Sequence, residues 1–92
     1  MTARDARSAT LALLAARAAE ATVCPSEVAR ALAGHGWREA MPEVHAAVDG
    51  LLAEGIVRLS WKGAPLVTRA GPYRIGRAPG PLPLAGEGRE GP

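Results

Sequence analysis

The chain has no phenylalanine, asparagine or glutamine, and its 92 residues include a single cysteine. Cys24 cannot close a disulfide within the chain, which excludes a small secreted scaffold held together by disulfides. The longest apolar run, Ala9 to Ala16, is too short to cross a bilayer. This run resembles the core of a signal peptide, but Asp5 and Arg17 interrupt the pattern. We therefore expect a cytoplasmic protein without a membrane segment.

The hydrophobic fraction of 48% is largely alanine, which accounts for 20 residues. Alanine buries little area but has the highest helix propensity, so this composition favours thin, closely packed helices. A chain of this length forms one small domain that buries only about 60% of its unfolded surface. These limits exclude a doubly wound nucleotide-binding sheet, a TIM barrel and an enzyme with a deep enclosed pocket.

The first half of the chain predicts three helices. Residues 3–19 have apolar side chains at the i, i+3, i+4, i+7 spacing of one buried helix face. After the β-prone residues 22–23, a second helix is expected to begin at Pro25, because proline suits the first helical position. Glu27 stands at the third position of a capping box, and Gly34 is expected to end this helix.

The third helix is expected from Pro42 to about Glu54, after an irregular turn over residues 38–41. Proline inside a helix removes one hydrogen bond and clashes with the preceding turn, so we place Pro42 at the first helical position. Gly50 lowers helix propensity by about 1 kcal/mol, and we therefore expect another element to pack closely against it. Trp37, between the second and third helices, is expected to fill the small core.

After Gly55 the pattern of the sequence changes from helix to strand. Residues 56–61 and 73–77 are β-prone or alternate apolar with polar side chains, which predicts two strands. The eleven residues between them, 62–72, contain two glycines and two prolines and are expected to form a loop. Residues 78–92 contain four prolines and four glycines, a composition typical of a disordered tail.

The expected order is helix, short strand, helix, turn, helix, strand, loop, strand. This is the order of a winged helix, in which a helix-turn-helix is followed by a β-hairpin called the wing. We therefore expect an α+β fold that is mainly α: a winged helix-turn-helix with three helices and a small hairpin. The domain is expected over residues 1–77 and the tail over residues 78–92.

Five segments carry a similarity to a known family. They are LALLAAR (11–17), TVCPSEVARAL (22–32), WREAMPEV (37–44), LLAEGIVRLSWKG (51–63) and GPYRI (71–75). On these segments, the chain resembles the small bacterial domain-of-unknown-function family numbered 3253. The similarity extends over about four fifths of the chain. The resemblance implies a winged-helix-like fold and a bacterial source, and it carries no biochemical activity.

Charge is distributed unevenly along the chain. Residues 1–55 carry a net charge of −2, residues 56–77 carry five cations and no acid, and residues 78–92 carry −1. A basic wing is suited to phosphate contacts or to a minor groove, and the simpler alternative is a solvated basic hairpin. The candidate nucleic-acid-binding residues lie on this segment and on the third helix. They are Arg38, His45, Arg58, Lys62, Arg69, Arg74 and Arg77.

The exposed face expected for the third helix is a poor match for a polyanion, because four acids outnumber Arg38 and His45. These acids are Glu39, Glu43, Asp49 and Glu54. The chain also has no asparagine or glutamine to read adenine. We therefore expect DNA binding through the wing with weak sequence preference. The alternative is a protein-interaction module that uses the acidic third helix and binds no nucleic acid.

Trp61 and Cys24 each have a chemical and a structural interpretation. Trp61 could stack on a nucleobase, but aromatic residues are scarce, so a hydrophobic anchor beneath the wing is the better interpretation. Cys24 at the start of the second helix could be a reactive thiolate. With no second cysteine to resolve an oxidised state, it is better interpreted as a small buried residue at a helix cap.

His35 and His45 do not form a metal site with Cys24, because their spacings of eleven and ten match no compact zinc motif. His35, between two glycines, is expected in a turn. The sequence also shows no phosphate-binding glycine loop and no Ser-His-Asp arrangement. We therefore expect no enzyme, no cofactor and no bound metal. Monomer and dimer both stay open, since the alanine-rich first helix suits either.

Overall fold

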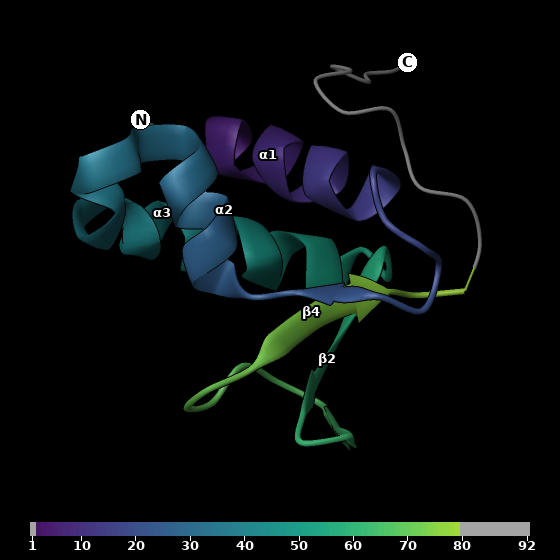
Figure 1. Cartoon of the computed structure of the whole chain (residues 1–92). Helices are drawn as coiled ribbons and strands as arrows, with labels where there is room; N and C mark the ends of the chain where they lie inside the picture. Colours follow the sequence, from purple (N-terminus) through teal and green to yellow (C-terminus); the bar gives the residue numbers. More distant parts are fainter. Residues whose placement is uncertain (1, 80–92) are drawn as a thin grey trace.

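The computed structural model describes residues 2–79, which form three α-helices, a 3₁₀ turn and a four-stranded antiparallel sheet (Figure 1). In chain order these are α1 (Ala3–Ala15), β1 (Thr22–Val23), α2 (Pro25–Ala33), the 3₁₀ turn (Gly34–Gly36), α3 (Trp37–Ala53), β2 (Val57–Trp61), β3 (Ala64–Leu66) and β4 (Arg74–Arg77). The expected α+β, mainly helical fold is confirmed. Apart from its first two residues, the tail expected over residues 78–92 lies outside the described part of the chain.

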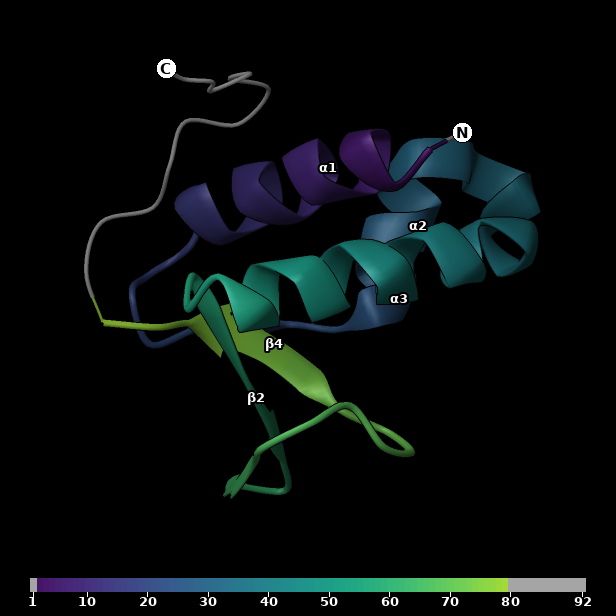
Figure 2. The ribbon, with the colours of Figure 1, turned by 180° about the vertical axis from the view of Figure 1, so that it is seen from behind.

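The helices form one layer, and the sheet lies against it (Figure 2). The core between the layers consists of aliphatic side chains and Tyr73. Its largest fully buried members are Leu14, Leu51, Leu59, Ile75, Val23, Val28, Val44, Val48 and Val57. Within residues 2–79, no helix is long and apolar enough to cross a membrane.

Helix α1 is shorter than the predicted helix over residues 3–19, because it ends at Ala15. Alanine propensity alone would continue it, but the chain has to turn here so that β1 can pair with β4. The Arg77 guanidinium donates hydrogen bonds to the carbonyls of Leu14 and Arg17, at 2.8 and 2.9 Å. Tertiary contacts therefore set the end of α1.

Helix α2 begins as predicted, with Pro25 in its first turn and Glu27 accepting a hydrogen bond from the Cys24 amide at 3.0 Å. The Glu27 carboxylate also pairs with Arg17, at 2.6 Å, so that the end of α1 is tied to the start of α2. The hydrogen bonds from Arg17 and from the Cys24 amide lower the pKa of Glu27 to about 2. Gly34 ends the helix with a φ of 55°, as its lack of a Cβ allows.

Helix α3 corrects the prediction of an irregular turn over residues 38–41. It begins at Trp37 and contains Pro42 as an internal residue. A proline inside a helix costs about 3 kcal/mol. Starting the helix early buries Ala40 and packs Trp37 and Met41 against the core, and Pro42 itself lies on the exposed side. Core packing thus outweighs the local preference of proline.

The prediction of close packing at Gly50 was wrong. A Cβ atom added at Gly50 would meet no other atom within 4 Å. The glycine therefore lowers helix propensity without a compensating contact.

Replacing Gly50 with alanine should raise the free energy of unfolding by roughly 0.5–1 kcal/mol, because the helix interior loses a flexible residue and gains no clash. Urea denaturation followed by circular dichroism would measure this change. The matched control is Gly55→Ala: Gly55 has a φ of 76°, so the same substitution should destabilise there. A destabilised Gly50→Ala variant would contradict the open space described at this position.

The sheet has the strand order β1-β4-β2-β3. Strand β3 was not predicted, because residues 62–72 contain prolines and glycines typical of a loop. Lys62 and Gly63 have φ values of 52° and 82°, so they form a two-residue turn that brings Ala64 opposite Trp61. The Lys-Gly pair between two β-prone residues was the signal for this hairpin. Strand β3 is an edge strand and tolerates Pro65 for that reason.

Candidate nucleic-acid interface

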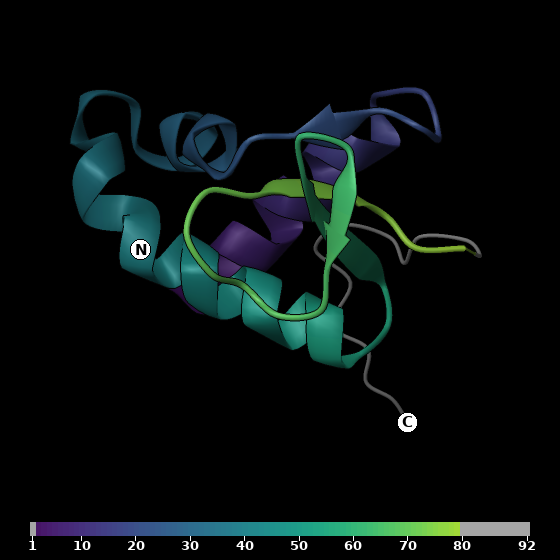
Figure 3. The ribbon, with the colours of Figure 1, turned by 90° about the horizontal axis from the view of Figure 1, so that it is seen from below.

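One face of the sheet packs on the helices, and the opposite face is open to solvent (Figure 3). Side chains alternate between the two faces of a strand, so the buried Leu59 and Ile75 define the core face. The outer face then consists of the residues between them and of their partners in register. These are Thr22, Arg58, Ser60, Pro65, Arg74 and Gly76.

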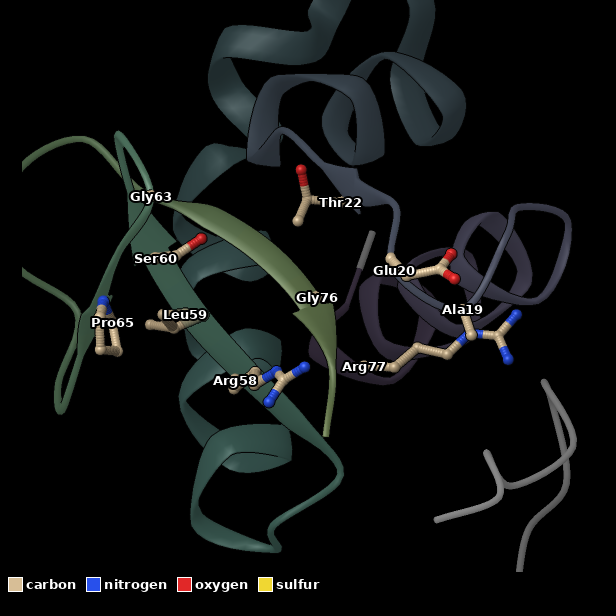
Figure 4. Close-up of a pocket in the computed structure, with 10 residues that line it drawn as sticks. All are labelled: Ala19, Glu20, Thr22, Arg58, Leu59, Ser60, Gly63, Pro65, Gly76 and Arg77. Atoms are coloured by element: carbon tan, nitrogen blue, oxygen red, sulfur yellow. The ribbon is translucent and has the colours of Figure 1, made fainter. Parts of the chain in front are cut away.

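A shallow pocket with a volume of about 360 Å³ lies where the outer face meets the segment between α1 and β1 (Figure 4). Its lining combines two arginines, one acid and the polar residues of the outer face. The lining residues are Ala19, Glu20, Thr22, Arg58, Leu59, Ser60, Gly63, Pro65, Gly76 and Arg77. Gly76 forms part of the pocket floor. A side chain at this position would crowd Thr22, since a Cβ atom would lie 3.3 Å from the Thr22 methyl group.

Two exposed cations belong to the hairpin, Arg58 on the outer face and Lys62 in the turn. Neither forms an ion pair with any residue in the described part of the chain. Lys62 lies in the tight turn of the hairpin, with its ammonium 6.0 Å from the centroid of the Trp61 ring. Both cations are therefore available to an external anion.

Trp61 differs from the hydrophobic anchor beneath the wing that we predicted, because it is largely open to solvent on one side. Its exposed fraction is 38%, and it belongs to the exposed large hydrophobic residues. It follows Val57 and Leu59 in the row of side chains on the core face, but the hairpin here extends past the helices (Figure 1). The sequence thus showed on which face of the strand Trp61 lies, but not that the helices end before they reach it.

Arg74 lies on the outer face but is partly engaged within the protein. Its Nε donates to the Thr22 hydroxyl at 2.7 Å, and one Nη donates to the Thr22 carbonyl at 3.3 Å. These bonds hold β1 against β4. The charge still contributes to the potential of the outer face, because no acid pairs with this guanidinium among residues 2–79.

Arg77 has a structural role. Its Nη2 donates to two carbonyls at the end of α1, and its Nε is buried without a hydrogen-bond partner among the described residues. A cation at this position also complements the negative end of the α1 dipole. Only part of the guanidinium therefore faces the pocket.

Arg69 and His45 tie the loop before β4 to α3. Arg69 forms a two-point ion pair with Asp49, at 2.9 and 3.0 Å, which lowers the pKa of that carboxyl. His45 Nδ1 lies 2.7 Å from the Tyr73 hydroxyl. Burial lowers the pKa of His45 and raises that of Tyr73 to about 12, so this bond joins two uncharged groups at neutral pH. Both Arg69 and His45, which the sequence predicted as site residues, are therefore engaged by partners within the protein.

Arg38, the remaining predicted site residue, lies at the start of α3 with its guanidinium 4.5 Å from the centroid of the Trp37 ring. We predicted that Trp37 fills the core, but it is only partly buried and packs against the edge of the core. Arg30, which the sequence did not single out, stacks on the same ring at 4.5 Å. Thr22 and Ser60 on the outer face were also missed, although the alternation around Leu59 was a usable signal for Ser60.

The acids of α3 are partly occupied by internal contacts. Asp49 pairs with Arg69, and Glu54 pairs with Arg7 at 2.8 Å, which joins the end of α3 to α1. Glu39 is exposed and Glu43 is half-buried. The acidic face considered for a protein partner is thus smaller than the sequence indicates.

Cys24 is half-buried, with its Sγ 3.1 Å from the Ser26 hydroxyl. Burial raises the pKa of the thiol, but hydrogen bonds from Ser26 and the start of α2 lower it by more, so the net shift is downward. His35 lies exposed in the 3₁₀ turn, as expected for a turn residue. Over residues 2–79, no three metal-ligating side chains gather around one point.

Residues 3–78 match the sequence model of a protein family described as "Protein of unknown function (DUF3253)". The match extends over well more than half of the chain, so the chain belongs to this family, and the resemblance noted from its sequence segments is confirmed. No curated protein matches the chain.

Proposed function

We propose that this member of the DUF3253 family is a winged-helix domain that binds nucleic acid, with duplex DNA as the ligand, through its outer face and hairpin. The order of helices and strands supports the fold, as does the pairing of β4 between β1 and β2. In this proposal, α2 and α3 form the helix-turn-helix, and β2, β3 and the loop before β4 form the wing.

The observation that carries the binding proposal is a pair of exposed cations, Arg58 on the outer face and Lys62 in the hairpin turn, that form no ion pair within the described residues. The strand residues of the outer face include no acid, and one acid, Glu20, lines the adjoining pocket. Arg74 is the diagonal neighbour of Arg58 on the adjacent strand β4. The Cα atoms of diagonal neighbours are about 7–8 Å apart. The free Arg58 guanidinium can donate two hydrogen bonds to one phosphate, and Arg74, which already donates to Thr22, adds positive charge beside it.

We propose that recognition depends on phosphates and depends little on base sequence. Half of the exposed residues of α3, Pro42, Ala46 and Ala53, offer no hydrogen bonds to base edges. Of the exposed polar residues, Arg38 stacks on Trp37, Asp49 pairs with Arg69, and Glu39 is an acid. Binding of this kind is strongly salt-dependent, because each neutralised phosphate releases counterions.

The test is a titration of fluorescently labelled duplex DNA at several salt concentrations. We expect the parent protein to bind with a log–log salt slope on the order of −3 to −5. In the variant Arg58→Ala/Lys62→Ala, the slope should be smaller in magnitude by about 2, because two phosphate contacts disappear. Both side chains are exposed, so the fold should stay intact.

The matched control removes the same charge from the far side of the molecule. Arg4→Glu lowers the net charge by the same two units on α1, which lies across the helix layer from the hairpin (Figure 1). Arg4 is exposed and forms no ion pair within the described residues, so the fold should stay intact and this variant should keep the salt slope of the parent. If both variants lose the same affinity, total charge and not the outer face controls binding. If the parent binds no duplex at about 50 mM salt, the nucleic-acid proposal fails and the protein-interaction alternative takes its place.

A further inference from the structure

A second basic surface lies at the corner between α2 and α3, on elements that do not belong to the hairpin (Figure 1). Its residues are Arg30, His35, Trp37 and Arg38, which we call the Trp37 cluster. Arg30 belongs to the last turn of α2, and Arg38 to the first turn of α3. The guanidinium carbons of both arginines lie 4.5 Å from the centroid of the Trp37 ring.

The two guanidinium groups carry like charges, and neither is neutralised by an ion pair within the described part of the chain. Both guanidinium carbons lie 4.5 Å from the centroid of the same ring, so the distance between them cannot exceed twice that value. Neither arginine forms an ion pair within residues 2–79, and Glu39 on the same turn pairs with neither. The attraction between each cation and the ring face holds both charges in place.

A hollow of about 420 Å³ opens at this cluster, and its lining carries cations and no acid. The lining residues are Arg30, Gly34, His35, Trp37 and Arg38. His35 is exposed in the 3₁₀ turn and adds ring nitrogens that can donate to a bound anion. Most of the lining residues are exposed, so the hollow is open to solvent.

The chemistry of the cluster selects a phosphate. Guanidinium groups present rigid forks of N–H donors that match phosphate oxygens in two-point contacts. The Trp37 ring already stacks on two guanidinium groups, so a nucleobase would first have to displace one of them. An anion in the hollow can accept hydrogen bonds from the guanidinium N–H groups at its wall, and its negative charge offsets that of the arginines.

We propose that the Trp37 cluster is a second phosphate-binding site, separate from the outer face of the sheet. The phosphate belongs either to the backbone of a nucleic acid, in which case the inference rests on the proposed function, or to a free phosphate compound. In the first case, the protein contacts a duplex at two places, the hairpin and the helix corner.

The test uses W61F, in which Trp37 is the remaining tryptophan. Inorganic pyrophosphate is added at constant ionic strength, with chloride as the control anion, and Trp37 fluorescence is recorded. We expect a saturable change with pyrophosphate and none with chloride. Adding Arg30→Ala/Arg38→Ala should weaken pyrophosphate binding at least tenfold, whereas Arg58→Ala/Lys62→Ala should leave it unchanged.

A second arm measures duplex binding against salt with the two arginine replacements in the otherwise unchanged chain. The magnitude of the slope should fall by about 2, as for two lost phosphate contacts. Arg30→Lys/Arg38→Lys keeps the charge but not the fork, so it should recover the slope and only part of the pyrophosphate affinity. Urea denaturation of each variant shows whether the cluster is folded, and a purely structural cluster would change stability alone.

The two proposals fail separately. If pyrophosphate leaves Trp37 fluorescence unchanged and the salt slope survives the arginine replacements, the phosphate site is overturned while the outer face stands. If the parent binds no duplex but pyrophosphate binds at the cluster, the nucleic-acid function is overturned and the site serves a free phosphate compound.

Discussion

Replacing Arg77 with methionine should lower the free energy of unfolding by about 2–3 kcal/mol. The guanidinium donates to the carbonyls of Leu14 and Arg17, at 2.8 and 2.9 Å, and these groups end α1. A charge-assisted hydrogen bond is worth about 1.5–3 kcal/mol, and water would replace part of the two that are lost. Methionine keeps the aliphatic volume, so packing around the stem is retained.

Urea denaturation at pH 7 measures this loss, with Arg77→Lys as the control. Lysine keeps the charge at the end of α1 but cannot reproduce the guanidinium geometry, so an intermediate loss is expected. A methionine variant as stable as the parent would refute the capping role. The result also bears on binding studies, because the DNA affinity of an Arg77 variant has to be corrected for its loss of stability before it can be assigned to a phosphate contact.

Replacing Leu51 with alanine should lower the free energy of unfolding by about 3–4 kcal/mol. Leu51 is fully buried on α3, which packs against both other helices and against β2. The substitution removes apolar contacts and leaves a cavity that a core made largely of alanine and valine is too short of side-chain volume to refill. For a domain of this size, such a loss is a large part of the total stability.

Thermal unfolding followed by circular dichroism would measure this effect, and a fall in Tm of more than about 12 °C is expected. The adjacent Leu52 is only partly buried, so Leu52→Ala should have a clearly smaller effect. Together with Gly50→Ala, which should stabilise, these neighbours form a series along α3. Equal losses at Leu51 and Leu52 would contradict the orientation of the helix.

Local signals predicted those elements whose boundaries depend on nearby residues. Pro25 and Glu27 mark the start of α2, and Gly34 marks its end, because caps and turns act within one helical turn. The position of Pro42 inside α3 was not predictable in this way. Its cost is local and visible in the sequence, whereas the burial of Ala40 and Met41 that outweighs it depends on the whole core.

The same limit applies to the candidate site. The sequence showed that the cations gather between residues 56 and 77, but not which of them already have internal partners. Arg69 pairs with Asp49, Arg74 bonds to Thr22, and Arg77 bonds to the end of α1, across separations of 20 to 63 residues. Such contacts exist only once the chain has folded. Of the five charges, three thus have hydrogen-bond or ion-pair partners within the protein, and two, Arg58 and Lys62, have none among the described residues.

Strand β3 limits the ways in which another protein can bind. In a hairpin closed by two residues, Trp61 and Ala64 form the hydrogen-bonded pair, so at the next position the backbone nitrogen of Pro65 faces outward. Proline has no N–H there, and Ala64 and Leu66 direct theirs toward β2. This side of the sheet offers no backbone donor to an incoming peptide strand. A peptide strand could therefore pair with β3 only by donating to the Pro65 carbonyl, so a protein that recognises the hairpin depends mainly on its side chains.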